Sequence, residues 1–249
     1  MLLKQKQTQA WTTPLATVDA VYALLCRGTN LLEDKGNVTV SIGNAKRVWA
    51  ELDTSKEQTG RLRATYGKES KLVKAKNITI KTQGEGSAWG AGYAQYLIPI
   101  AEMKQQGGAL NVKKELYVRR KNVDGIVVLE PIKNSMLHVG DEVVSRLIVT
   151  LDRDMDYLHL KDARGACFEP MNSNSGYRLG ISVCYYEEVK DAGVNLFFNH
   201  LSKGVYIVEH SYRVVRSGEY ESGVATISSA YAPEFTSHTA GEKVRVSAR

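Results

Sequence analysis

The sequence predicts a mainly β protein with two β-sandwich-like domains preceded by one amphipathic helix. From residue 37 onward, apolar residues recur with a period of two in many short segments. Gly, Asn, Asp and Ser separate these segments, as they do in turns between antiparallel strands. Clear helical periodicity is confined to residues 13–28. These three observations together favour strands over helices for most of the chain.

The predicted helix has recognisable start and stop signals. Thr13 can cap its first turn, Pro14 suits the first helical position, and Gly28 suits the left-handed position after its end. A 3-4-3 spacing places four apolar residues on one face, namely Leu15, Val18, Tyr22 and Leu25. A helix of this length is marginal alone. We therefore expect its apolar face to pack on a neighbouring part of a larger protein, or to mediate self-association.

The first β region contains predicted strands at 37–42, 60–66, 76–82 and 110–120. In the interruption at 89–108, small residues would allow Trp89 and Tyr93 to pack closely against backbone as structural aromatic residues. The polar stretch KNVDG ends in a turn signal, and we place the main boundary there. The predicted domains are 1–33 for the terminal helix, 34–124 for the first β domain and 125–249 for the second.

The second β region has the pattern of a sandwich. In residues 141–152, Val143, Ser145 and Leu147 share one face of a strand, whereas Arg146 and Thr150 face the other side. Further strands are expected within 157–162, 180–188, 193–201, 203–220, 223–231 and 242–248. Antiparallel strands at this spacing, with turn signals between them, predict a β-sandwich.

Composition and charge exclude several functions. The net charge of +6 comes with lysines clustered in the first half, and no nucleic-acid motif accompanies them, so we expect a solvated face and no nucleic-acid partner. No apolar stretch approaches the roughly 18 residues of a membrane span, and the first residues lack signal-peptide features. The three cysteines lack the paired spacing of a zinc site. We expect no cofactor and no metal.

Motifs for catalysis are also lacking. Asp152, Asp154 and Asp156 could ligate calcium in a loop, but the glycine and the later glutamate of an EF-hand are missing, so three carboxylates on a solvated face are the simpler interpretation. No HExxH or Gly-x-Ser-x-Gly motif occurs. Glycine-rich residues 84–92 lack the lysine of a phosphate loop. The chain is not expected to be an enzyme, and an autonomous hydrolase is the least favoured hypothesis.

One segment near the C-terminus restricts the backbone. Pro233 cannot donate to a strand ladder and drives Ala232 toward an extended conformation, so a strand must leave its sheet near Tyr231. Tyr231 and Phe235 would then lie in a constrained corner. Both rings could fill the end of the sandwich, which is the usual role of large aromatic side chains, or they could contact a partner.

Several longer segments resemble a known family. These are GSAWGAGYAQYL, KKELYV, the stretch from His138 to Arg178 with DRDMDY, ARGACFEP and SGYR, and GVATISSAYAPEFTSHTAGEKVRV. Together they resemble the C-terminal region of bacterial α2-macroglobulin-like proteins, especially those of Bacteroidetes. The resemblance implies that residues 1–33 end a helical thioester domain, that 34–124 belong to a CUB-like β domain, and that 125–249 form the terminal macroglobulin sandwich.

The resemblance also implies a function. Proteins of this family trap proteases, because cleavage of a bait region triggers a conformational change and a reactive thioester attaches the protease. The chain would be the non-catalytic C-terminal part of a broad-spectrum endopeptidase inhibitor in the cell envelope, periplasmic or surface-anchored. Its partners would be the other domains of that protein and, through them, proteases. The alternative is a self-contained sandwich that binds a glycan or a partner protein through exposed aromatic residues.

The chain itself lacks the thioester motif. The family pattern is Cys-x-Glu-Gln, and in Cys167-Phe168-Glu169-Pro170 a proline replaces the glutamine whose carbonyl forms the bond. We therefore expect Cys167 to be a small apolar residue. By resemblance, Tyr231 and Phe235 would shield the thioester of a neighbouring domain or make an interdomain contact. Relatives often carry methionine before this tyrosine, whereas this chain has Ala230.

Overall fold

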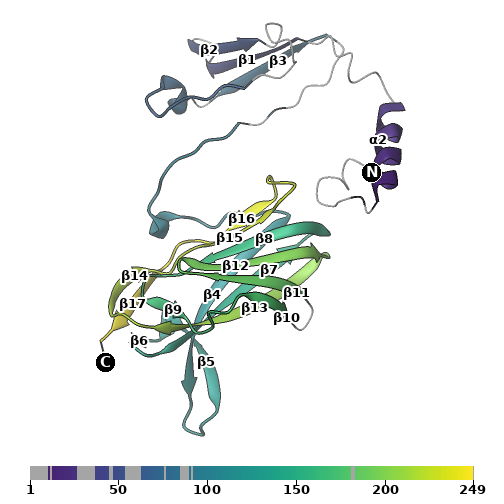
Figure 1. The fold of residues 1–249 in the computed structure, drawn as a ribbon. Helices are drawn as coiled ribbons and strands as arrows, with labels where there is room; N and C mark the ends of the chain where they lie inside the picture. Colours follow the sequence, from purple (N-terminus) through teal and green to yellow (C-terminus); the bar gives the residue numbers. More distant parts are fainter. Residues whose placement is uncertain are drawn as a thin grey trace. The chain divides into compact units, whose positions relative to one another are not determined.

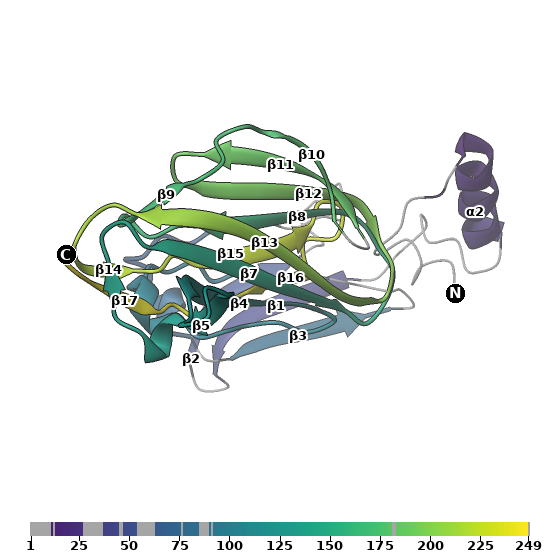
Figure 2. The same cartoon turned by 90° about the horizontal axis from the view of Figure 1, so that it is seen from below.

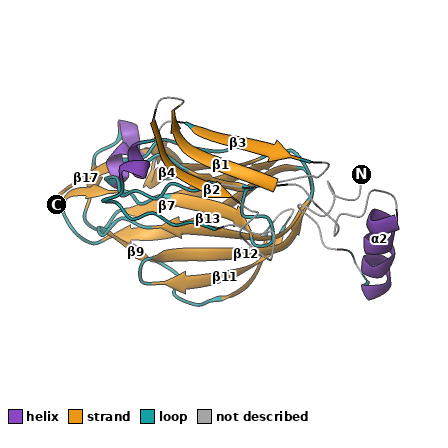
Figure 3. Cartoon of the chain, turned by 90° about the horizontal axis from the view of Figure 1, so that it is seen from above, coloured by secondary structure: helices purple, strands orange, loops and turns teal. Residues whose placement is uncertain are grey.

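The computed structural model describes Trp11 and residues 13–26, 37–44, 47–53, 63–75, 77–84, 90, 92–180 and 183–248. These residues are mainly β, as the sequence predicts (Figure 3). The chain divides into two compact units, Thr12–Leu97 and Ile98–Arg249, the second taken with Met1–Trp11. Among the helices described, none is both long and apolar enough to cross a membrane.

The N-terminal unit begins with α2, Pro14–Cys26. The helix starts where the sequence predicts, because the Ala16 N–H donates to Thr13 Oγ1 at 3.1 Å. Gly28, which was predicted for the left-handed position after the end of the helix, lies outside the described residues. Only Ala20 of this helix is buried, and the predicted apolar stripe is exposed at Leu15, Val18, Tyr22 and Leu25.

A three-stranded antiparallel sheet follows in the order β2-β1-β3. Its strands are β1 (Asn37–Asn44), β2 (Arg47–Asp53) and β3 (Ile78–Gln83). The strand predicted at 60–66 is wrong for residues 63–66, which have no regular structure, and the short 3-10 helix η2 (Lys71–Lys74) comes after them. The strands described in this unit form a single sheet.

Two sequence predictions concern aromatic residues of this unit. Tyr93 is 92% exposed, so its ring is not packed against backbone as the sequence predicted. The physical reason is local: residues 92–97 are all exposed and belong to no helix or strand that could hold the ring. Trp89 lies outside the described residues.

The C-terminal unit is a β-sandwich with an added small sheet (Figure 1). Its five-stranded sheet has the order β5-β4-β7-β13-β9, with bounds Val127–Pro131, Leu110–Lys121, Glu142–Leu151, Gly204–Val214 and Phe168–Pro170. Its six-stranded sheet has the order β10-β11-β12-β8-β15-β16, with bounds Gly176–Leu179, Cys184–Lys190, Gly193–Leu201, Met155–Ala163, Ala225–Ser229 and Thr236–His238.

A third sheet of three strands has the order β14-β17-β6, with bounds Gly218–Glu221, Lys243–Ser247 and Leu137–His138. In this sheet β17 runs parallel to β6. Single-turn 3-10 helices occur at η3 (Ile100–Glu102) and η4 (Ile132–Asn134). The segment predicted as one strand over 203–220 is therefore two strands, β13 and β14, that belong to different sheets.

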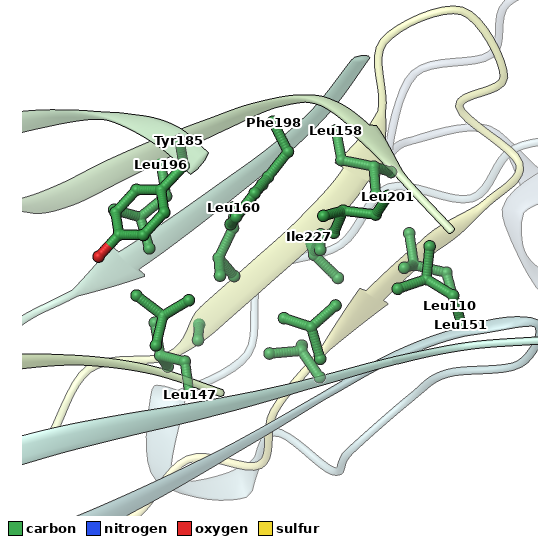
Figure 4. Packing of buried hydrophobic residues seen from close by; sticks show 14 of the residues in the cluster. Leu110, Leu147, Leu151, Leu158, Leu160, Tyr185, Leu196, Phe198, Leu201 and Ile227 are labelled. Carbon is green, nitrogen blue, oxygen red and sulfur yellow. The ribbon is translucent and has the colours of Figure 1, made fainter. Parts of the chain in front are cut away.

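The main core lies between the two larger sheets (Figure 4). Leu147 and Leu151 come from β7 of the five-stranded sheet, and Leu160 and Phe198 come from β8 and β12 of the six-stranded sheet. The inward face predicted for β7 is confirmed, since Val143, Ser145, Leu147, Val149 and Leu151 are all buried. A second cluster involves β17 and contains Leu116, Val118, Leu137, Val143, Cys167, Phe168, Tyr212, Val214, Val244 and Val246.

The predicted boundary at residues 124 and 125 does not match this division. β4 pairs with β7 along its length, from Leu110 opposite Leu151 to Arg119 opposite Glu142, so β4 belongs to the sandwich. The polar stretch is the tip of the β4–β5 hairpin, where Asn122 Oδ1 accepts from the Asp124 and Ile126 N–H groups. The turn signal therefore marks a hairpin that extends beyond the sandwich (Figure 1), and the unit begins near Ile98.

Candidate interaction site at the Tyr231 corner

The corner around Pro233 connects β15 to β16. β15 ends at Ser229, as the sequence predicts for a strand that must leave its sheet before the proline. The Ser229 N–H donates to the Phe235 carbonyl at 3.0 Å, and the Phe235 N–H donates to the Ala232 carbonyl at 2.9 Å. The chain then re-enters the same sheet as β16. These bonds fix the backbone on both sides of Tyr231.

The two aromatic rings of this corner have different environments. Phe235 is partly buried against the main core, and the Arg153 guanidinium lies 5.5 Å from its ring centroid. Tyr231 is 74% exposed. Its ring meets that of Tyr157 edge to face, with centroids 5.1 Å apart. Phe235 therefore fills the end of the sandwich, whereas Tyr231 presents most of its surface to the outside.

Tyr157 has an unusual backbone conformation. Its φ of 53° is the one positive φ at a non-glycine residue in the described part of the chain, and its carbonyl accepts from the Ala230 N–H at 2.9 Å. A left-handed conformation at a bulky residue costs about 1–3 kcal/mol and is typical of binding and active sites. This conformation shifts the inward–outward alternation of β8 by one residue. Met155 and Leu158 are both buried although they lie three positions apart. Tyr157 is thereby turned outward.

The nearby aspartates have separate partners. Asp152 pairs with Arg153 at 2.8 Å, Asp154 accepts from the Lys203 N–H at 2.7 Å, and Asp156 Oδ1 lies 2.6 Å from His200 Nδ1. Within the described ranges, no group of three or more His, Cys, Asp or Glu side chains could hold a metal ion. The calcium interpretation therefore gains no support from this loop.

Cys167 is fully buried in the second core cluster. Burial raises the pKa of its thiol to about 11, so the thiol stays protonated at neutral pH. Pro170 ends β9 and pairs with Tyr212 of β13. The environment of Cys167 is that of a small core side chain.

A buried polar cluster lies inside the sandwich, and the sequence analysis did not identify it. Asp162 Oδ1 lies 2.7 Å from Lys114 Nζ, and its Oδ2 lies 2.8 Å from Ser145 Oγ and 2.9 Å from His210 Nε2. The Lys114 and Asp162 side chains are only 6% and 0% exposed. Three backbone carbonyls, those of Ala163, Ser222 and Gly223, also accept from Lys114 Nζ.

The cluster links both large sheets electrostatically. Burial alone would raise the pKa of Asp162, but the charge of Lys114 and the hydrogen bond from His210 outweigh it and hold that pKa well below its usual range. The sequence contains one signal for this cluster: its lysine and its aspartate lie at positions of the strand alternation that otherwise carry inward apolar residues. Lys114 lies between the apolar residues Val112 and Leu116 on the inward face of its strand, and Asp162 follows the inward Leu160 in the same way.

Taken together, the fold and the corner define a mainly β protein whose C-terminal sandwich exposes aromatic side chains on a rigid corner. Residues 110–234 match the family model of the bacterial alpha-2-macroglobulin MG10 domain. The chain belongs to the bacterial alpha-2-macroglobulin family, which confirms the resemblance found in the sequence. No curated protein matches the chain.

Solved structures of this family are also similar. Salmonella alpha-2-macroglobulin reacted with methylamine is 18% identical over 68% of this chain and 10% of that chain, with a TM-score of 0.45. Trypsin-activated Escherichia coli alpha-2-macroglobulin is 11% identical over 98% of this chain and 16% of that chain, with a TM-score of 0.49. Native E. coli alpha-2-macroglobulin from domain MG7 to the C-terminus is 12% identical over 99% of this chain and 41% of that chain, with a TM-score of 0.44. The chain thus spans a minor part of each.

Proposed function

We propose that the chain is the non-catalytic C-terminal part of an alpha-2-macroglobulin-like inhibitor of broad endopeptidase specificity. The family match over residues 110–234 supports this proposal. In it, the sandwich from Ile98 onward is the terminal macroglobulin domain, the three-stranded sheet belongs to a CUB-like domain, and α2 ends the helical thioester domain. The sandwich holds and shields a reactive thioester that lies in a neighbouring domain.

The exposed ring of Tyr231 carries the shielding proposal. A thioester in contact with water hydrolyses, so it must be kept dry until it reacts. An aromatic side chain supplies a large apolar area with few rotatable bonds, so burying it against a partner costs little conformational entropy. Tyr231 is 74% exposed on a backbone that hydrogen bonds fix on both sides. It is therefore suited to cover a bond on an adjacent domain.

Tyr157 supports the same function. In place of the methionine that relatives often carry, Ala230 offers little apolar surface. The ring of Tyr157 lies against Tyr231 and is itself 44% exposed. A pair of rings can thus supply the apolar area that a methionine would add. Phe235 supports the corner from within through its contact with the core.

The partners in this proposal are the other domains of the inhibitor and, through them, proteases. The inhibitor works in the bacterial cell envelope, either in the periplasm or anchored at the surface. The exposed stripe of α2, with Leu15, Val18 and Tyr22, is covered by the remainder of the helical domain in the whole inhibitor. In the isolated chain, the same stripe leads to self-association.

A protease-trapping assay on the inhibitor that contains this chain tests the proposal. Wild type is expected to form a covalent, detergent-stable complex with trypsin. Tyr231→Ala should form less of this complex, because water reaches the thioester before the protease does. Tyr231→Phe keeps the ring and should behave as wild type, and Ile207→Ala, an exposed apolar change on β13, is the matched control. Wild-type yields for Tyr231→Ala would refute the shielding role.

The second candidate is a self-contained sandwich that binds a glycan or a partner protein. One observation favours it: aromatic side chains lie side by side on the outer face of the six-stranded sheet, at Tyr177, Tyr186, Phe197 and His159. An isolated chain that binds an oligosaccharide would support this candidate over the first.

A further inference from the structure

An aromatic row crosses four strands of the six-stranded sheet. Tyr177 pairs with Tyr186, Tyr186 with Phe197, and Phe197 with His159, so one aromatic side chain from each of β10, β11, β12 and β8 lies in the same row. Neighbouring ring centroids are 5.2, 6.5 and 4.7 Å apart along it. Figure 2 shows these four strands side by side. We call these four residues the aromatic row.

The aromatic row is not part of either core. Tyr177 is 75% exposed and Phe197 is 40% exposed. By contrast, Tyr185 next to Tyr186 and Phe198 next to Phe197 point inward and are buried. The solvent face of an antiparallel sheet normally carries polar side chains. A contiguous exposed apolar patch on such a face marks an interaction surface. Folding of the sandwich therefore does not account for the row.

Neighbouring rings of the aromatic row meet at different angles. Phe197 and His159 stack with an interplanar angle of 5° and a centroid distance of 4.7 Å, so the two rings cover each other's faces. Tyr177 meets Tyr186 at 75°. Tyr186 and Phe197 meet at 43°. A sugar ring needs an uncovered aromatic face, and the stacking of Phe197 on His159 covers one face of each ring, so the centre of the row favours a protein partner.

Polar side chains border the row on one side. His159 Nε2 lies 3.1 Å from Asn195 Oδ1, Asn195 Nδ2 donates to Glu188 at 2.9 Å, and Lys190 pairs with Glu188 at 2.8 Å. An aromatic centre with a hydrogen-bonded polar rim is typical of protein–protein interfaces. Aromatic residues near the centre of such interfaces contribute most of the binding energy.

The aromatic row is continuous with the Tyr231 corner. His159 and Tyr157 lie two residues apart on β8, and the ring of Tyr157 contacts that of Tyr231. Both parts belong to the outer side of the same sheet. A partner that buries Tyr231 and Tyr157 therefore has Phe197 and Tyr186 directly beside its contact.

We propose that the domain that carries the thioester contacts Tyr231 and also docks across the aromatic row. The identity of this partner rests on the proposed function. In this arrangement Tyr231 and Tyr157 exclude water at one end of the interface, and Tyr186 and Phe197 supply most of the affinity at its centre. The partner packs apolar side chains against these rings and places polar groups opposite Glu188 and Asn195.

Hydroxyl-radical footprinting of side chains tests the docking. The intact inhibitor and the isolated 249-residue chain are exposed to the same radical dose, and modification of each residue is read by mass spectrometry. Tyr177, Tyr186 and Phe197 should lose most of their modification in the intact inhibitor. Ile207, which is exposed on the opposite sheet, serves as the internal reference. Equal modification of the row in both samples would overturn the proposal.

A variant pair adds a second readout. Tyr186→Ser with Phe197→Ser should restore modification of Tyr177 in the intact inhibitor, because the interface loses its central contacts. Val205→Ser with Ile207→Ser removes exposed apolar side chains from β13 and should leave the protection of Tyr177 unchanged. Full protection of Tyr177 in the Tyr186 and Phe197 variant would contradict the assigned role.

Different results would refute the shielding role of Tyr231 and the docking surface on the aromatic row. If Tyr231→Ala lowers the yield of protease complex but the row is equally modified in both samples, the shielding role stands and the docking surface falls. If the row is protected but Tyr231→Ala has no effect on complex yield, the docking surface stands and the shielding role falls. Protection of the row in the isolated chain by a β-glucan hexasaccharide, or by dimerisation, would assign the surface to a different occupant and overturn the inference.

Discussion

The ring of Tyr231 meets the ring of Tyr157 edge to face at 5.1 Å, and the Ala230 N–H donates to the Tyr157 carbonyl at 2.9 Å. The left-handed backbone of Tyr157 makes this relationship possible, since it turns the ring outward from β8. The strain at Tyr157 and the exposure of Tyr231 thus belong to one arrangement. This arrangement affects the free energy of unfolding, which can be measured on the isolated chain.

Replacing Tyr157 by glycine and by alanine should separate strain from ring contact. Both variants lose the ring, but only glycine adopts a φ of 53° without steric cost. Tyr157→Gly should therefore be more stable than Tyr157→Ala by about 1 kcal/mol. Urea denaturation of the two variants measures the difference. Equal free energies of unfolding would show that the backbone at this position is not strained.

Removing the charge of Lys114 should destabilise the sandwich strongly. Lys114→Met leaves the Asp162 carboxylate buried with no ammonium partner, and loss of one partner of a buried ion pair costs about 3–5 kcal/mol. Lys161→Met is the matched control, because Lys161 lies on the same strand as Asp162 with its side chain exposed. Urea unfolding should show a large loss for the first variant and almost none for the second. Similar stabilities would contradict the cluster's role.

The same carboxylate predicts a pH dependence of stability. The pKa of Asp162 is lower in the folded chain than its usual value of 3.8, so folding favours the ionised form. Its contribution is complete above that usual value and is lost as the pH falls toward the folded-state pKa. Wild type should therefore lose stability more steeply than Asp162→Asn as the pH falls below about 4. Parallel pH profiles of unfolding would rule out a depressed pKa at Asp162.

Two glycines with the same backbone angle should respond differently to alanine. Gly223 has a φ of 78°, and a Cβ there would lie 2.1 Å from the Ala163 carbonyl oxygen, whereas Gly125 has a φ of 77° with open space around it. Gly125→Ala should cost about 1 kcal/mol from backbone strain alone, and Gly223→Ala about 3 kcal/mol because the clash is added. Thermal unfolding of both variants tests this. A cost for Gly223→Ala no larger than that for Gly125→Ala would contradict the close approach.

Local periodicity predicted the helix and most of the long strands. β4, β7, β12 and β15 were predicted because inward apolar residues alternate along each of them, and α2 because Thr13 and Pro14 mark its start. Strands of two to four residues, such as β6, β9 and β10, are too short to show a period. The boundary was misplaced because a hairpin tip and a linker share the same polar composition.

The sites depended on long-range register, which local patterns do not contain. Tyr185–Tyr186 and Phe197–Phe198 are adjacent aromatic pairs, and one member of each must face outward. Only the pairing of β11 with β12 shows that Tyr186 and Phe197 lie together on the outer face. In the same way, Lys114, Asp162 and His210 come from three distant strands. The sequence alone predicts the Tyr231 corner, because its constraint, Pro233, is local.

The most direct test of the proposed shielding is the rate at which a free thiol is released in the inhibitor that is proposed to contain this chain. Thiol titration over time reports hydrolysis of the thioester without any protease. We predict a slow release in wild type and in Tyr231→Phe, and a much faster release in Tyr231→Ala, because only the last variant exposes the thioester to water. A thiol that is already free in freshly purified wild type, or equal release rates in wild type and Tyr231→Ala, would contradict shielding by Tyr231.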